Sequence, residues 1–234
     1  MLHMKRRFQY FLLLVTIAAV SCKKDNFSEP GSLLSGKVAY KGEAIGVENY
    51  QVPFQLYQYG FGKVGPVDGT VSQDGTYSAL LFDGDYKLII PNGQGPFLWK
   101  KLASGAPDSI SVALRGNQTL DLEVMPYYMI RNPQITGGSG KVTAVFKAEK
   151  IITDANAKNI ERVNLYINKT QFVSGGNNVG STQINGGAIA DPNNISLNVT
   201  VNPIPGQNYV FARIGLKIDG VEDMIFSPVQ KITY

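Results

Sequence analysis

The sequence is poor in the side chains that most enzymes use. It has one cysteine and one histidine in 234 residues, Cys22 and His3, and both lie close to its amino-terminal end. Ser-His-Asp triads, Cys-His pairs and zinc sites built from His or Cys each need an imidazole or a thiolate, and the chain after residue 22 has neither, so these sites are excluded there. Disulfides are excluded as well, because no second cysteine exists. What remains is carboxylate, lysine or tyrosine chemistry, or none, and we expect a protein that is not an enzyme and holds no metal and no cofactor.

Charged residues are also scarce, at 17% of the chain against ~25% in an average soluble domain. Without the first 21 residues, 19 basic residues face 18 acidic ones. A net charge so close to zero favours neither nucleic acid nor an anionic membrane surface as a partner. No long stretch repeats its apolar residues with the 3.6-residue period of a helix. Glycine is abundant instead, and short runs in which apolar and polar residues alternate recur. This composition is typical of an extracytoplasmic β-protein with polar loops.

The first 25 residues have the pattern of a secretory signal peptide. A basic cluster, Lys5-Arg6-Arg7, precedes an apolar run that is shorter than the ~20 residues needed to span a bilayer. The run ends at small residues followed by Cys22, which resembles a bacterial lipobox, although Ala19 stands where leucine is usual. The resemblance implies a signal peptide over residues 1–21 and a lipid on Cys22, and several acyl chains anchor a protein firmly. The alternative is an ordinary secreted protein with a free cysteine.

Two β domains are predicted after the lipidated cysteine and a short tether, residues 22–33. Residues 34–126 contain short runs in which apolar and polar side chains alternate, the pattern of half-buried strands. Residues 127–234 contain about seven such runs, which suits an immunoglobulin or fibronectin-III-like sandwich. The predicted fold class is therefore all-β, with two tandem β-sandwich domains.

Turn chemistry adds local predictions. Asp74-Gly75 and Asp219-Gly220 each predict a β-hairpin, because Asp-Gly suits the two central positions of a hairpin turn. Residues 172–187 are rich in Gly and Asn and are predicted to be a loop. Residues 131–140 contain proline and paired glycines and are predicted to be either a linker or an edge turn.

Four stretches of the first domain resemble the transthyretin-like, carboxypeptidase-regulatory type of β-sandwich. They are Gly36-Lys37-Val38, Gly42-Glu43-Ala44-Ile45, Gln73-Asp74-Gly75-Thr76-Tyr77 and Gly84-Asp85-Tyr86-Lys87-Leu88. Most of these are turn and core positions, so the resemblance supports a fold and says little about activity.

Four further stretches extend a resemblance over nearly the whole chain after the leader. They are Gly95-Pro96-Phe97-Leu98-Trp99, Val124-Met125-Pro126-Tyr127-Tyr128, Ser139-Gly140-Lys141-Val142-Thr143-Ala144 and Arg213-Ile214-Gly215-Leu216-Lys217-Ile218. Together they resemble the DUF3823 family of Bacteroidetes lipoproteins. That resemblance implies a lipid-anchored position in the outer membrane, facing the cell surface. It also implies a starch-utilisation-type transporter and its glycan-binding lipoprotein as partners, and hence the capture of polysaccharide or oligosaccharide.

Loop aromatics are the candidates for ligand binding, because sugar rings stack their C–H faces on Trp and Tyr while amides bond their hydroxyls. Trp99, the only tryptophan of the sequence, and Phe97 lie in a predicted loop, and Tyr57 and Tyr59 approach another. The alternative is that Trp99 packs as a core residue at one end of the first sandwich. Asp108-Ser109-Ile110 resembles the short O-glycosylation motif of Bacteroidetes envelope proteins, with Ser109 as the acceptor.

These features predict a non-catalytic surface lipoprotein that binds glycans as an accessory component of a polysaccharide-utilisation system. One alternative is a structural spacer or protein-docking subunit of an outer-membrane complex. Another is a glycoside hydrolase that uses two carboxylates, which requires a cleft of a depth that small sandwiches rarely enclose.

Overall fold

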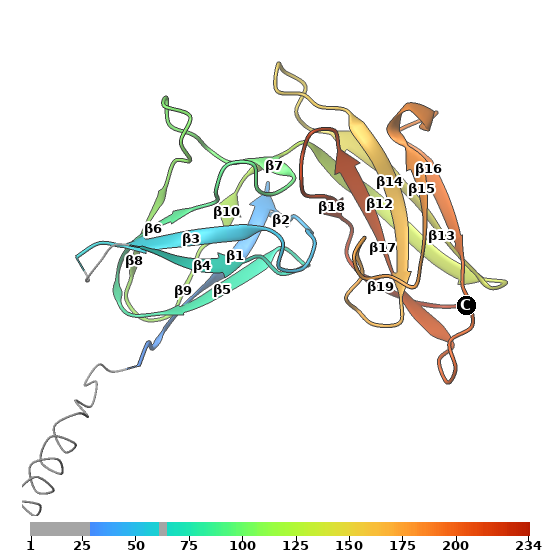
Figure 1. Ribbon diagram of the computed structural model, residues 1–234, viewed down its shortest axis with the longest axis horizontal. Coiled ribbons are helices and arrows are strands. Elements are labelled where there is room, and N and C mark those ends of the chain that lie inside the picture. Colours follow the sequence, from blue (N-terminus) through green and yellow to red (C-terminus); the bar gives the residue numbers. More distant parts are fainter. Residues whose placement is uncertain (1–28, 61–64) are drawn as a thin grey trace, which may run out of the picture. The chain divides into compact units, whose positions relative to one another are not determined.

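The computed structural model describes residues 29–60 and 65–234, so the predicted signal peptide and Cys22 lie outside the described residues. Gly31–Tyr234 forms one compact unit. Its described part consists of β-strands, turns and one 3₁₀ turn, without an α-helix, and the all-β prediction is confirmed (Figure 1). Within that part, no helix has the length and hydrophobicity needed to cross a membrane.

In the described residues, eleven strands form the first sandwich. Their bounds are β1 Ser32–Tyr40, β2 Glu43–Ala44, β3 Pro53–Gln58, β4 Pro66–Thr70, β5 Thr76–Leu81, β6 Gly84–Ile89, β7 Phe97–Leu98, β8 Ile110–Leu114, β9 Gln118–Thr119, β10 Leu122–Glu123 and β11 Met125–Pro126. One sheet has the antiparallel order β4-β3-β6-β8, and β7 pairs with β11 in a small two-stranded sheet. The remaining sheet is built around β1.

β1 has partners along both of its edges. Its first half pairs antiparallel with β5 and parallel with β9, and its second half pairs antiparallel with β2 and parallel with β10. Leu34 and Val38 of β1 belong to the same buried cluster as Phe54 and Leu56 of β3, and all four side chains are fully buried. Two sheets thus enclose one apolar core, as in a β-sandwich.

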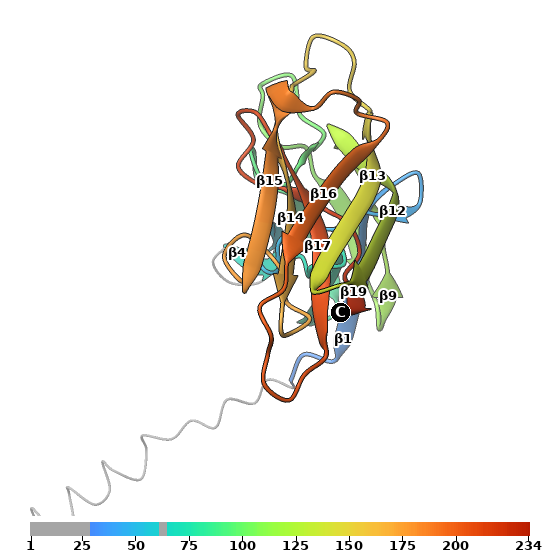
Figure 2. The ribbon, with the colours of Figure 1, turned by 90° about the vertical axis from the view of Figure 1, so that its right-hand side faces the viewer.

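Eight strands form the second sandwich. Their bounds are β12 Tyr128–Gly138, β13 Lys141–Lys150, β14 Ile160–Asn168, β15 Gly180–Asn185, β16 Ile195–Thr200, β17 Tyr209–Ile218, β18 Ile225–Phe226 and β19 Gln230–Thr233, with the 3₁₀ turn η1 at Gly186–Ala188. Figure 2 shows β13 between β12 and β16 in one sheet. The other sheet has the order β15-β14-β17-β18, and β19 also pairs with β17.

β14 is buried on both of its faces, for two different reasons. Val163, Leu165 and Ile167 belong to the main apolar cluster between the two sheets. Asn164 and Tyr166 alternate with them and therefore lie on the opposite, outer face of the sheet, yet they are almost as buried. Tyr166 packs there in a smaller apolar cluster with Val173, Met224 and Phe226, so the outer face at β14 is partly covered.

Arg213 of β17 connects the two sandwiches and is only 1% exposed. Its Nε donates to the carbonyl oxygen of Ser227 at 2.8 Å, Nη1 donates to that of Val47 at 3.0 Å, and Nη2 donates to that of Gln73. Its Cζ lies 4.4 Å from the centroid of the Phe226 ring, a cation–π contact. Among the described residues, no carboxylate lies within ion-pair distance of it. Burial lowers the pKa of Arg213 to about 10, so the guanidinium is still positive at neutral pH.

The two Asp-Gly turns have different outcomes. Asp219-Gly220 connects β17 to β18, which pair antiparallel, so this hairpin is confirmed. At Asp74-Gly75 the turn forms, with a positive φ of 84° at the glycine, but the hairpin prediction is wrong. β4 pairs with β3 whereas β5 pairs with β1, so the turn carries the chain from one sheet to the other.

Two stretches predicted to be irregular contain strands. Residues 131–140 are mostly strand β12, and the ladder shifts register between Arg131 and Gln134, which accommodates the intervening proline. Residues 172–187 include β15, whose alternate side chains Ser181, Gln183 and Asn185 are exposed. The loop prediction failed because a strand with so few apolar side chains resembles a polar loop in sequence.

Candidate functional site

A polar concavity of about 550 Å³ lies on the outer face of β14 and β15. Its lining residues are Glu161, Arg162, Asn164, Tyr166, Gly175, Asn178, Ser181, Gln183 and Asn185, and we call this surface the amide face. Six of them oppose one another across the two strands, as the pairs Arg162–Asn185, Asn164–Gln183 and Tyr166–Ser181. Directly opposed Cβ atoms lie ~4.5–5.5 Å apart, so each pair forms one rung of a polar ladder.

Asn164 occupies the middle rung and is the residue on which the amide face depends. It is 4% exposed, and its Nδ2 donates to Oε1 of Gln183 over a long 3.4 Å. Its Oδ1 is buried and has no hydrogen-bond partner among the described residues. A buried oxygen left unpaired costs about 1–3 kcal/mol, so such groups call for an explanation. A donor supplied by a bound ligand provides one.

The connection between β14 and β15 forms one wall of the amide face and is fixed by its own amides. Asn168 Nδ2 donates to the carbonyl oxygen of Phe172 at 2.7 Å and to Oδ1 of Asn177 at 3.1 Å. Asn178 Nδ2 donates to the carbonyl oxygen of Gly175 at 2.9 Å. These bonds order the wall, and within the described part of the chain Asn178 Oδ1 accepts no hydrogen bond, so it is available to a ligand.

The amide face is electrically neutral. Its two charged residues, Arg162 and Glu161, form an ion pair through Nη1 and Oε1. That pair is about one-third exposed, so it contributes little to stability, but it cancels the charge. Burial raises the pKa of Tyr166, so its hydroxyl keeps its proton at neutral pH. The surface therefore offers amide and hydroxyl groups as donors and acceptors without a net charge.

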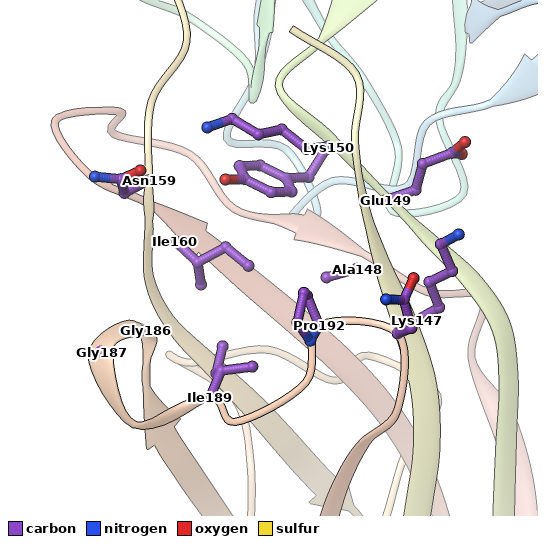
Figure 3. Close-up of a pocket in the computed structure, with 12 residues that line it drawn as sticks. Lys147, Ala148, Glu149, Lys150, Asn159, Ile160, Gly186, Gly187, Ile189 and Pro192 are labelled. Atoms are coloured by element: carbon purple, nitrogen blue, oxygen red, sulfur yellow. The ribbon is translucent and has the colours of Figure 1, made fainter. Parts of the chain in front are cut away.

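A second concavity, of about 700 Å³, lies at one end of the same sandwich, between the end of β13, the start of β14 and η1 (Figure 3). We call it the end cleft. Its lining residues are Tyr128, Lys147, Ala148, Glu149, Lys150, Asn159, Ile160, Gly186, Gly187, Ile189, Pro192 and Asn193. It is larger and more apolar than the amide face.

The structure places Trp99 and Phe97 in the core. They are 6% and 4% exposed and belong to the main apolar cluster. Trp99 Nε1 donates to the carbonyl oxygen of Asp108 at 2.7 Å, which satisfies its polar atom internally. The two rings border a cavity of about 210 Å³, below the ~300 Å³ at which ligand pockets usually begin. Trp99 is therefore a core residue, as the alternative interpretation held. Stacking on a sugar needs an exposed ring face, and the buried ring of Trp99 does not offer one.

The remaining predicted site residues lie apart from both concavities. Tyr59 is 64% exposed, and Tyr57 is half-buried with its hydroxyl donating to Oε1 of Gln55 at 2.9 Å. Neither tyrosine lines the amide face or the end cleft. Ser109 is half-buried, and its backbone N–H donates to Oδ1 of Asp108.

Sequence reasoning missed the amide face, although a signal for it was present. Asn164 and Tyr166 alternate with Val163, Leu165 and Ile167, which indicates a strand with one apolar and one polar face. The partner strand was hidden in the Gly- and Asn-rich stretch. Because cross-strand register is set by tertiary pairing, the rungs could not be assigned from the sequence.

Family models match the two sandwiches in turn. Residues 32–125 match the amino-terminal domain of a protein family of unknown function, DUF3823, and residues 128–231 match the domain of unknown function DUF3823_C. The chain belongs to the DUF3823 family. The resemblance inferred from the sequence is therefore confirmed, as are the two tandem β domains that it implied. No curated protein matches the chain significantly.

Solved structures of other DUF3823 proteins share this fold. One from Parabacteroides merdae is 34% identical, covering 88% of this chain and 100% of its own, with a TM-score of 0.76. One from Bacteroides ovatus is 28% identical, covering 86% and 98%, with a TM-score of 0.74. A Bacteroides uniformis protein that is provisionally described as carbohydrate-binding has a TM-score of 0.68 over 88% of this chain and 100% of its own. At 16% identity it shows a common fold only.

Proposed function

We propose that this DUF3823 protein is a non-catalytic carbohydrate-binding protein whose amide face holds the ligand. The observation that carries the proposal is the buried, unpartnered Oδ1 of Asn164 in the middle of a neutral ladder of amides. Sugar hydroxyls are donors and acceptors at once, so they can satisfy this oxygen and the amide groups of the neighbouring rungs together. A carbohydrate-binding role for a protein of the same fold is in keeping with this, as an analogy.

The amide face suits binding better than catalysis. Glycoside hydrolysis needs two carboxyl groups, one of them with a raised pKa. The lining of the amide face contains a single carboxylate, Glu161, which is paired with Arg162. Amides and hydroxyls neither accept nor release protons near neutral pH, so these residues can hold a sugar without attacking it.

We further propose that the protein works at the outer membrane. The lipobox-like sequence around Cys22 supports a lipid anchor facing the cell surface, with the 22–33 tether between the lipid and the first sandwich. In that position a bound polysaccharide or oligosaccharide would be passed to a starch-utilisation-type transporter and its lipoprotein, the partners that the family resemblance implies.

The test is binding of the purified protein to a panel of plant, host and microbial polysaccharides, measured by calorimetry. The double substitution Gln183→Ala/Asn185→Ala removes two exposed amides from the amide face. We expect it to weaken binding roughly ten-fold or more, because each lost hydrogen bond contributes ~0.5–1.5 kcal/mol. Its melting temperature should fall by only a few degrees, because both side chains are exposed and the one bond lost by a buried group, from Asn164 Nδ2 to Gln183 Oε1, is long at 3.4 Å.

Asn198→Ala is the matched control, because Asn198 is an exposed strand amide in the other sheet of the same sandwich. It should bind glycan as the wild type does. If the control loses as much affinity as the double variant, the ligand does not occupy the amide face. If the wild type binds no glycan at all, the proposal is wrong and a spacer or docking role in an outer-membrane complex takes its place.

A further inference from the structure

The end cleft lies beyond the point at which β13 and β16 stop pairing in register. β13 and β16 pair from Lys141–Thr200 up to Phe146–Ile195 and not beyond. Past that point the backbone N–H of Ala148 donates to the carbonyl oxygen of Pro192 at 2.8 Å. The cleft is therefore built into the backbone of the sandwich and does not depend on the position of one side chain.

The floor of the end cleft is apolar. Figure 3 shows Ala148, Ile160, Ile189 and Pro192 gathered around its centre. Ile160 and Ile189 are half-buried and pack against the main core, so the floor is an exposed part of that core. A volume of about 700 Å³ is within the ~300–1,000 Å³ typical of small-ligand sites. Its size and apolar floor suit a compact ligand with ring faces.

The rim of the end cleft carries an unbalanced positive charge. Lys150 and Asn159 lie above the floor in Figure 3, and the Lys150 Nζ is 6.0 Å from the centroid of the Tyr128 ring. Within the described residues, Lys150 has no carboxylate at ion-pair distance. The one carboxylate of the lining, Glu149, points away from the cleft and is paired with Arg131.

We infer that the end cleft is a second binding site, separate from the amide face, for a ring compound that carries a carboxylate. The ring would lie on the apolar floor, and the carboxylate would be bound by Lys150 Nζ with help from the Asn159 amide. Two sources share this chemistry: a uronic acid residue of an acidic glycan, and an aromatic carboxylate. This inference does not depend on the proposed role of the amide face.

Titration of the purified, isotope-labelled protein with three probes, followed by NMR, separates the sources. The probes are tri-galacturonate, its carboxyl-reduced neutral trisaccharide, and cinnamate. We expect at least one carboxylate probe to shift the resonances of Ile160, Gly187 and Ile189 and not those of Gln183. The neutral trisaccharide should leave the end cleft unperturbed. No shift with either carboxylate, or equal shifts with the neutral sugar, would overturn the inference.

A matched pair of substitutions tests the charge. A Cβ built on Gly187 meets no atom within 4 Å and its φ is not positive, so a side chain fits there without strain. Gly187→Glu and Gly187→Gln add the same bulk at the rim, but only the first adds negative charge. Gly187→Glu should bind the carboxylate probe roughly five- to ten-fold more weakly than Gly187→Gln. Equal affinities in this pair would show that the rim does not recognise charge.

The contribution of Lys150 is tested by Lys150→Gln, with the exposed Lys169→Gln as its control. We expect Lys150→Gln to lose about ten-fold in affinity for the carboxylate probe and to lose the salt dependence of binding. The control should behave as the wild type. Retained affinity in Lys150→Gln would overturn the assigned role of its ammonium group, and failure here would leave glycan binding at the amide face unaffected.

Discussion

Replacing Arg213 with methionine should destabilise the protein, although removing a buried charge often stabilises one. Exchanging a whole buried ion pair for apolar residues is frequently neutral or favourable, because both charges lose their desolvation cost together. At Arg213 the situation differs, since its three partners are backbone carbonyls that no substitution can remove. A methionine side chain fills much of the space of the arginine, but it has no N–H group to donate to the three carbonyl oxygens.

The magnitude follows from counting the orphaned oxygens. The carbonyl oxygen of Gln73 also accepts the backbone N–H of Val47 at 3.3 Å, so it keeps one partner. The carbonyl oxygens of Val47 and Ser227 lose Arg213, at about 1–3 kcal/mol each for a buried unpaired group. Relief of guanidinium desolvation offsets part of this. We expect a net loss of about 2–4 kcal/mol, or roughly 4–16 °C in Tm for a chain of this size.

Urea denaturation of wild type, Arg213→Met and Arg115→Met provides the assay. Arg115 is the control because its ion pair with Asp85 is well exposed, so its loss should cost less than ~1 kcal/mol. The Arg213 variant should unfold at lower urea with an unchanged m-value. If Arg213→Met is as stable as the wild type, the desolvation cost of the cation outweighs its three hydrogen bonds, and the reasoning is refuted.

Three further predictions concern the buried tyrosines, Trp99 and two glycines. Burial raises the pKa of Tyr77 and of four other tyrosines, so the folded state holds those protons more tightly than the unfolded state does. The free energy of unfolding should therefore fall as the pH rises above ~10, which is measured as Tm against pH. A Tm that holds constant to pH 11 would contradict this. Trp99→Phe should lose about 1 kcal/mol by removing the indole hydrogen bond, while glycan affinity stays unchanged in calorimetry; an affinity loss would return Trp99 to the binding site. Gly36→Ala should destabilise the protein by about 2 kcal/mol or more in urea titrations, because its Cβ would lie 1.9 Å from a backbone carbonyl oxygen. Gly138→Ala is the control and should be neutral, because a Cβ at Gly138 meets no atom within 4 Å. Similar losses in both variants would refute the steric argument.

The sequence was most informative where apolar periodicity was strong. Ile195–Thr200 alternates strictly, and it forms a strand with buried Ile195, Leu197 and Val199. Where polar residues dominate, as in β15, the pattern of a strand and that of a loop coincide, and only pairing with β14 decides between them. The Asp74-Gly75 turn was recognisable, but which sheet received the next strand depended on partners far away in the sequence.

The candidate sites were less accessible to prediction than the fold. Trp99 was considered as a binding residue because it lies in a loop, yet burial is decided by what packs over the loop, which the local sequence does not encode. The amide face requires the register of two strands, and the end cleft requires the point at which β13 and β16 part. Each depends on tertiary geometry, so composition alone could not identify either.

The pairing of β1 has a consequence for the order in which the first sandwich folds. Its parallel neighbours β9 and β10 follow it by more than 80 residues, as the register pairs Leu34–Gln118 and Val38–Leu122 show. Contacts between such distant segments form late, because the loop between them must close first. β1, the first strand of the described residues, is therefore among the last to complete its hydrogen bonds. Until about residue 124 is available, one edge of β1 stays open, so the first sandwich can complete its hydrogen bonds only when nearly all of its chain is present.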